Sequence, residues 1–299
     1  MLLKNADLWT PQGWMRGDIR LKKGQIAETG SVLTPEAEEP VRDLEGDFLL
    51  PGFVDVHIHA FRGQDTMNGE EAIRSMAREL WKEGVAAFCP TTMSASPEDT
   101  RKAVLGVREV RLHPAADEAR VLGVHMEAPF LSEKKAGAQR KEFFRNPDAA
   151  LLLEMTDGHP EDVSLITLAP EKPGSEAFIR WAAARGIHVS LGHTAASAEQ
   201  VHQAGDWGAD HITHTFNAQT PLGHREPGVP GAALTDDRFY TEMICDGIHL
   251  HRDTVRLIWR AKGSNKAVAI TDAMEAAGLP DGTSTPDNSS LLPCRRHGV

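Results

Sequence analysis

Long apolar runs, paired cysteines and excess positive charge are all scarce in this sequence, and each shortage excludes a class of protein. No apolar stretch approaches the ~18 residues that a membrane-spanning helix needs, and the N-terminus lacks the basic start and apolar core of a secretory signal. The 3 cysteines (Cys89, Cys245 and Cys294) are odd in number and widely spaced, so they predict neither a disulfide framework nor a CxxC metal site. We therefore expect a cytoplasmic protein without a membrane partner.

The charge balance and several missing motifs narrow the function further. The chain carries 32 Lys and Arg against 43 Asp and Glu, a formal charge of −11, whereas binding to a nucleic-acid backbone demands a basic face. We expect no nucleic-acid partner. The absence of any GxG removes the dinucleotide fingerprint of a doubly wound open sheet. HExxH, GxSxG and GxxxxGK[ST] are also missing, so the common signatures of zinc proteases, serine hydrolases and P-loop proteins are absent.

The hydrophobic pattern changes character near Pro51. Residues 1–50 alternate polar and apolar side chains over short runs broken by glycine, which predicts a small unit of antiparallel strands. From Pro51 onward, short apolar runs alternate with helical stretches, giving eight strand candidates, most of them followed by a helix candidate. Repeated βα units predict a parallel sheet, and 299 residues leave room for the ~250 residues of a (β/α)8 barrel.

Side chains of the types that bind metals stand near the C-terminal ends of most of these strand candidates. In a parallel barrel those ends form one mouth, so residues distant in sequence converge there. Imidazoles and carboxylates around one mouth supply the nitrogen and oxygen ligands of a divalent metal. Taken singly, each could equally be a buried histidine with satisfied hydrogen bonds or a carboxylate paired with arginine; together they favour a metal site. These residues are His57, His59, Glu127, His193, His214, His249 and Asp272.

The motifs taken together resemble the amidohydrolase superfamily and, within it, the N-acetylglucosamine-6-phosphate deacetylases. PGFVDVHIHA, HMEAPFLSEKKAGAQ, SLGHT, THTFNAQTPLGHREPGVPGA, CDGIHL and AITDAMEAAGLPDG follow in the family's order between Pro51 and Gly282. HxH and TDA are common among amidohydrolases, whereas MEAPF, HxxNA with REPG, and DGIH are narrower. The resemblance implies a TIM-type barrel with a small β-sandwich domain, which we expect to be incomplete because of the short C-terminus. We expect a small β domain at 1–50, the barrel with its metal site at 51–282 and a divergent tail at 283–299.

The resemblance also implies a role for each residue of the site. Glu127, His193 and His214 match the ligands of a catalytic divalent metal, and His57 with His59 match those of a second metal in some family members. Zinc, iron, manganese and cobalt all suit such ligands, with one or two ions per subunit. Asp272 matches the general acid and base. The groups that hold the sugar phosphate and its hydroxyls match Gln139, Asn217, Ala218, Arg225 and His249.

The activity that this resemblance implies is metal-dependent hydrolysis of the acetamide of N-acetylglucosamine 6-phosphate to glucosamine 6-phosphate and acetate, a step of amino-sugar catabolism, by a homodimer. Two alternatives stay open: an amidohydrolase acting on another N-acyl substrate, and a truncated metal-binding remnant with impaired catalysis. The second alternative is suggested by the segment that follows Gly282, TSTPDNSSLLPCRRHGV. This segment departs from the Gly-rich, β-forming continuation of the family. From this departure we expect a shortened C-terminus, a disordered tail, an uncovered last strand and marginal stability.

Overall fold

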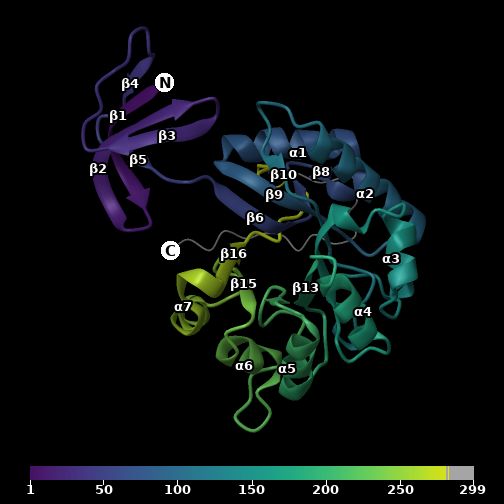
Figure 1. Ribbon diagram of the computed structural model, residues 1–299. Helices are drawn as coiled ribbons and strands as arrows, with labels where there is room; N and C mark the ends of the chain where they lie inside the picture. The colour runs from purple at the N-terminus through teal and green to yellow at the C-terminus, as the bar shows by residue number, and fades with distance from the viewer. Residues whose placement is uncertain (281, 283–299) are drawn as a thin grey trace. The chain divides into compact units, whose positions relative to one another are not determined.

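The computed structural model describes residues 1–280 and 282. The expected tail at 283–299, which includes Cys294, and the cover of the last strand lie outside the described residues. The chain forms two compact units, one from Met1 to Phe53 and the other starting at Val54. Figure 1 shows the first as strands alone and the second as strands enclosed by helices.

The first unit is one five-stranded sheet. It consists of β1 (Leu2–Thr10), β2 (Gly13–Lys22), β3 (Gln25–Gly30), β4 (Val41–Asp43) and β5 (Phe48–Leu49). The hairpins β1–β2 and β2–β3 are antiparallel, as the alternating pattern predicts. The prediction is wrong for β4 and β5, which pair with β1 in parallel, because the chain crosses over before it returns beside β1. Within the described residues this unit has a single sheet, so the second layer of the expected β-sandwich is not seen there.

The second unit is a barrel of parallel strands. Strands β9, β11, β12, β13, β14, β15 and β16 follow one another round the sheet in chain order, and each pairs in parallel with the next. The short β10 pairs in parallel with β9, and β6 also pairs with β9. This arrangement confirms the TIM-type (β/α)8 class predicted from the alternating pattern. The strands are β6 (Phe53–Ile58), β9 (Val85–Thr92), β10 (Arg120–Val121), β11 (Val124–Met126), β12 (Val163–Leu168), β13 (His188–Leu191), β14 (His211–Ile212), β15 (Tyr240–Ile244) and β16 (Ala267–Ile270).

Helices connect successive barrel strands and surround them (Figure 1). Ser96 and Ser197 begin two of them, each accepting a hydrogen bond from a backbone N–H three residues further on, as N-cap serines do. No helix in the described part of the chain has the length and apolar character needed to cross a bilayer. The helices are α1 (Glu70–Lys82), α2 (Pro97–Leu112), α3 (Ala149–Met155), α4 (Ser175–Ala183), α5 (Ala198–Trp207), α6 (Gly228–Thr235) and α7 (Arg252–Lys266). Shorter elements are the hairpin β7 (Ala60–Phe61) and β8 (Gln64–Asp65), and the 3₁₀ turns Thr66–Asn68, Glu133–Lys135, Lys141–Phe143 and Pro160–Asp162.

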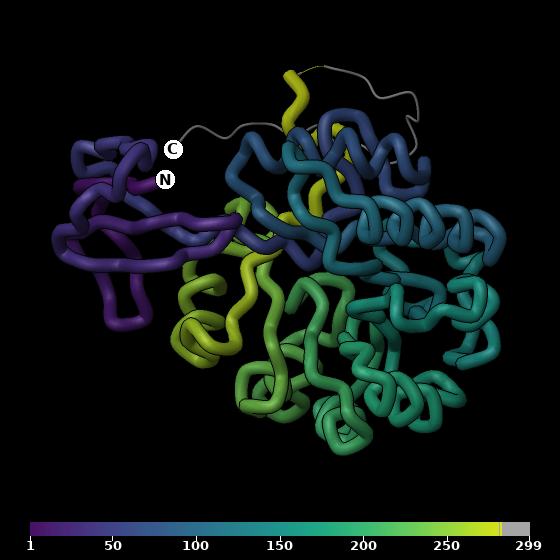
Figure 2. Tube along the Cα trace, turned by 45° about the horizontal axis from the view of Figure 1, so that its top comes forward, coloured from purple at the N-terminus to yellow at the C-terminus, as the bar shows by residue number. Residues whose placement is uncertain are grey.

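The barrel closes where the segment after β16 returns beside β6. The Asp272 N–H donates to the His57 carbonyl at 2.9 Å, and the His59 N–H donates to the Ala273 carbonyl at 3.0 Å. In Figure 2 the barrel segment of the chain can be followed in sequence order, and its yellow end lies beside the blue segment with which the barrel starts. Closure therefore places the residues after the last strand directly against the HxH segment of the first.

The carboxylate of Asp55 supports this closure from inside. It is 4% exposed, and it accepts hydrogen bonds from the Thr271 hydroxyl at 2.6 Å and from the His57 N–H at 3.2 Å. We expect Asp55→Ala to lower the free energy of unfolding of the metal-free protein by about 1–3 kcal/mol, because it leaves the buried His57 N–H without this acceptor and removes the partner of the Thr271 hydroxyl. Denaturant titration measures this loss. The milder Thr271→Val should lower the free energy of unfolding by about 1 kcal/mol. Equal, negligible losses for both variants would show that closure of the barrel between β6 and the segment after β16 does not depend on Asp55.

Candidate metal centre

The predicted ligands and the predicted acid–base residue all stand at the carboxyl ends of barrel strands. His57 lies within β6, and His59 and Glu127 directly follow their strands, whereas the other three residues lie two positions beyond theirs. The mouth expected from the sequence is therefore present. Its residues are His57 and His59 at β6, Glu127 at β11, His193 at β13, His214 at β14 and Asp272 at β16.

Backbone strain marks three of these strand ends. His193, His214 and Asp272 have φ values of 44°, 28° and 50°, a left-handed region that costs a non-glycine residue about 1–3 kcal/mol. Such residues persist only where the surroundings fix them. Gly192 supplies part of that fixation, since a Cβ at this position would lie 2.6 Å from the Cβ of Thr213.

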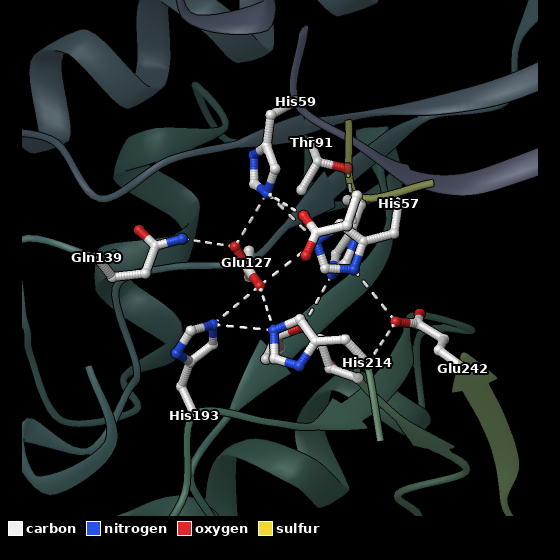
Figure 3. Close-up of polar contacts among 12 residues, drawn as sticks. His57, His59, Thr91, Glu127, Gln139, His193, His214 and Glu242 are labelled. Atoms are coloured by element: carbon white, nitrogen blue, oxygen red, sulfur yellow. Dashed lines mark hydrogen bonds and ion pairs between the residues drawn. The ribbon is translucent and has the colours of Figure 1, made fainter. Parts of the chain in front are cut away.

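Glu127 lies at the centre of the site (Figure 3). Its Oε1 is 3.1 Å from Nε2 of His193 and 3.1 Å from Nε2 of His214. Its Oε2 is 3.2 Å from Nε2 of His59 and accepts a hydrogen bond from the Gln139 amide at 2.5 Å. The carboxylate is 2% exposed, so imidazoles from three barrel strands surround a buried anion.

The charge of Glu127 is balanced by these imidazoles. Burial opposes its ionisation, but the nearby His57 and His193 outweigh this effect and hold the pKa of the carboxyl well below its usual range. Within residues 1–280 and 282, no arginine or lysine forms an ion pair with it. The described residues therefore contradict the alternative of a structural carboxylate paired with arginine for Glu127.

Distances between the imidazole nitrogens fit a metal. Nε2 of His193 and Nε2 of His214 are 3.1 Å apart, and Nε2 of His57 and Nε2 of His59 are 3.3 Å apart. Two nitrogens bound at about 2.05 Å to one tetrahedral ion lie about 3.3 Å apart. The structure thus contains two groups able to hold a divalent ion, His57–His59–Glu127 and Glu127–His193–His214, and the two share Glu127.

Asp272 stands beside the first of these groups. Its Oδ1 is 3.2 Å from Nε2 of His59 and 3.4 Å from Nε2 of His57. Burial would raise the pKa of this carboxyl, but the His57 and His59 imidazoles outweigh that effect and lower it. Its side chain is 20% exposed, against 0% for His57, so an ionised carboxylate lies where the site opens towards solvent.

The structure brings together only part of the predicted substrate-binding set. Gln139 contacts Glu127 and also accepts a hydrogen bond from the Ser94 N–H at 2.7 Å. The Asn217 N–H donates to the His214 carbonyl at 2.9 Å, and the Ala218 carbonyl accepts from the Thr194 N–H at 3.2 Å. Both residues therefore belong to the turn that carries His214.

Arg225 and His249 are exposed. Nδ1 of His249 lies 2.7 Å from a carboxylate oxygen of Asp246, and among the described residues neither Arg225 nor His249 has a hydrogen bond or ion pair to the metal ligands. For these two residues the resemblance remains the basis for a role in binding substrate.

Glu242, in β15, was missed by the sequence analysis. It is fully buried, and its Oε2 lies 3.2 Å from Nδ1 of His57 and accepts from the His214 N–H at 3.0 Å. The available signal was a carboxylate within the apolar run FYTEMI. The positions of the predicted site residues are strand ends, whereas Glu242 lies inside its strand.

A third group of possible metal ligands lies at the opposite, amino-terminal ends of β13 and β14. It consists of His188, Asp210 and His211. Here Asp210 offers one oxygen to each ring, at 2.6 Å from Nδ1 of His188 and 2.8 Å from Nδ1 of His211. His188 is exposed, and it is paired rather than free.

This pairing predicts a pH-dependent contribution to stability. The hydrogen bond to Asp210 raises the pKa of His188 against the effect of partial burial. Protonated His188 therefore stabilises the fold fully below its unfolded-state pKa of about 6.5, and the contribution disappears as pH rises through the higher folded-state value. We expect His188→Gln to lose up to about 1 kcal/mol near pH 6 and less near pH 9. Urea unfolding of both proteins measures this difference, and equal losses at the two pH values would contradict it.

Comparisons with known proteins agree with this site. The Amidohydrolase family model matches residues 48–290, and the chain belongs to the amidohydrolase family. It is 38% identical to the N-acetylglucosamine-6-phosphate deacetylase of Bacillus subtilis (strain 168), over 94% of this chain and 72% of that protein. It is 36% identical to the N-acetylgalactosamine-6-phosphate deacetylase of Escherichia coli O157:H7, over 95% and 74%.

A solved structure also agrees with the family and the fold. A mutant of the N-acetyl-D-glucosamine-6-phosphate deacetylase from Mycobacterium smegmatis, in complex with N-acetyl-D-glucosamine-6-phosphate, superimposes with a TM-score of 0.85 at 32% identity, covering 94% of this chain and 73% of that one. The family resemblance read from the motifs is confirmed.

Proposed function

We propose that this protein hydrolyses the acetamide of N-acetylglucosamine 6-phosphate, releasing glucosamine 6-phosphate and acetate. The observation that carries the proposal is the convergence of Glu127, His193, His214 and Asp272 at one barrel mouth. Relatives at 36–38% identity are named as deacetylases of amino-sugar 6-phosphates. A homodimeric state and a cytoplasmic location are parts of the same proposal.

Glu127, His193 and His214 would hold one divalent ion, and His57 and His59 would complete a second position that shares Glu127. When bound, such an ion acidifies a water molecule and polarises the amide carbonyl. Zinc, iron, manganese and cobalt all suit this mixed nitrogen and oxygen set. Because Glu127 carries the negative charge of both groups, its ionised form is the basis of the site's affinity for a cation.

Asp272 would move the proton. Its carboxylate is ionised and partly open to solvent, so it can take a proton from water as the water oxygen attacks the acetamide carbon. The same proton can then pass from Asp272 to the amide nitrogen as the carbon–nitrogen bond breaks, because an amine leaves far more readily than its anion. The products are acetate and the free amino sugar, which balances the added water.

The remaining predicted residues would hold the sugar phosphate. Arg225 suits the phosphate because its planar guanidinium donates two parallel hydrogen bonds. Asn217, the backbone of Ala218 and His249 are proposed to contact the phosphate and the sugar hydroxyls. Gln139 already donates to Glu127, so its proposed role is to border the substrate while fixing that carboxylate.

A second candidate substrate is N-acetylgalactosamine 6-phosphate. The E. coli relative named for that sugar is 36% identical, close to the 38% of the Bacillus subtilis enzyme. The two sugars differ only in the configuration of one hydroxyl, so the same chemistry would serve both.

Acetate release from both 6-phosphates and from unphosphorylated N-acetylglucosamine tests the proposal. We expect Arg225→Ala to lower kcat/KM for the preferred phosphorylated sugar about 10- to 100-fold, the cost of a lost charged hydrogen bond, and to leave the unphosphorylated sugar unaffected. Equal effects on both would remove Arg225 from phosphate binding. A protein that binds metal but turns over no N-acetyl sugar would favour the remnant, and turnover of other N-acyl compounds alone would favour the broader amidohydrolase.

A further inference from the structure

Glu242 is a buried carboxyl group that pairs with no lysine or arginine in the described part of the chain. It is 0% exposed, and within the described residues its ion-pair partner is an imidazole rather than a lysine or arginine. Its second oxygen, Oε1, is buried and makes no hydrogen bond there. A buried polar atom without a hydrogen bond is costly and needs an explanation, and the site that Glu242 touches offers one.

The contact with His57 fixes the proton on that ring. Nδ1 of His57 lies 3.2 Å from Oε2 of Glu242, an oxygen that can accept its hydrogen. A neutral ring that donates there leaves Nε2 free to bind an ion. That nitrogen faces Nε2 of His59 at 3.3 Å and Oε1 of Glu127 at 3.4 Å, the inner side of the first metal group.

The other histidine ligands lack such a partner. Nδ1 of His193 faces the neutral carbonyl of Lys135 at 2.9 Å, and Nδ1 of His59 and Nδ1 of His214 are buried without a hydrogen bond in the described structure. Among these ligands, His57 is thus the one whose outer nitrogen meets a carboxylate. Metal-binding histidines commonly have a carboxylate in this place, which orients the ring and raises its basicity.

Oε2 of Glu242, the oxygen beside His57, also contacts the other metal group, Glu127–His193–His214. It accepts from the His214 N–H at 3.0 Å, and His214 is the residue held at a φ of 28°. Figure 3 shows Glu242 on the outer side of His57 and His214, with Glu127 on their inner side. Glu242 therefore joins one ligand of each group without lying among the ligands.

We propose that Glu242 is a positioning residue that keeps His57 protonated at Nδ1 and directs its Nε2 to the metal, so that Glu242 governs filling of the His57–His59 position. This inference rests on the proposed metal site. Removing such a partner typically weakens metal binding about 10- to 100-fold. The effect should be greatest for the ion bound by His57 and smaller for the ion bound by His193 and His214.

Metal content after dialysis against graded chelator concentrations tests this directly, with Co²⁺ absorption as a second readout. We expect the unaltered protein to hold two ions per chain. Glu242→Gln, which keeps the acceptor and the shape but not the charge, should weaken one ion about 10-fold, and Glu242→Leu about 100-fold. The matched control is Thr241→Val, a buried neighbour on the same strand, which should bind both ions normally.

A double-variant comparison separates positioning from general damage. His57→Asn should lose the same ion, and adding Glu242→Gln to His57→Asn should add only the smaller effect on the ion bound by His193 and His214, because Glu242 acts on the first ion through His57. Full retention of both ions in the Glu242 variants would overturn the inference, as would a single ion in the unaltered protein that is indifferent to His57→Asn. Two ions without deacetylation would refute the proposed function and leave the inference intact.

Discussion

Asp272→Asn is expected to lower kcat for acetate release by about 10³- to 10⁴-fold, the contribution of a general acid–base residue, while the metal stays bound. Asparagine keeps the size of the side chain but can neither take the proton of the attacking water nor return it to the amine. The ligand nitrogens of His57 and His59 stay in place, since the Asp272 N–H, which asparagine retains, makes the hydrogen bond that closes the barrel.

Steady-state acetate release and metal analysis of the same preparation measure this effect. Asp253→Asn, an exposed carboxylate at the start of α7, is the control and should keep full activity. Undiminished kcat in Asp272→Asn would remove the proposed base. Loss of metal together with activity would show that Asp272 acts mainly as a ligand.

Glu127→Gln is expected to abolish both metal binding and activity, with a loss of kcat/KM of about 10³-fold or more. Glu127 belongs to both metal groups, and its charge is balanced by the surrounding imidazoles rather than by arginine or lysine in the described structure. Glutamine of the same shape removes the anionic ligand of each position at once.

Metal content and acetate release, with and without added zinc, check this expectation. Glu176→Gln, an exposed carboxylate in α4, is the matched control. Activity restored by a modest excess of zinc would show that the histidines suffice. The two variants should thus differ, since Asp272→Asn keeps its metal and Glu127→Gln does not.

The barrel and the centre of its site were predictable because their signals are local. Apolar runs alternating with helical stretches are visible in the sequence, and a parallel barrel forces all carboxyl ends to one mouth. Glu127, His193 and His214 lie one or two positions beyond such runs, so their convergence needed no knowledge of side-chain contacts. Their mutual distances, and the positive φ of His193 and His214, are results of tertiary structure.

Other features depend on contacts that no local pattern reveals. Glu242 lies inside β15, where its burial and its contact with His57 arise only once the strands are side by side. Asp55 meets Thr271 across 216 positions of sequence, and the parallel pairing of β4 with β1 depends on a crossover. Arg225 was identified from its motif alone, and the structure does not bring it to the ligands.

The central claim is that Glu127, His193 and His214 bind one catalytic ion. Anomalous diffraction from crystals grown with zinc, recorded above and below the zinc absorption edge, tests it most directly. We predict a peak about 2.0–2.2 Å from Nε2 of His193, Nε2 of His214 and a carboxylate oxygen of Glu127. If protein that releases acetate shows no peak there, or shows its only peak beside His188, Asp210 and His211, the claim is contradicted.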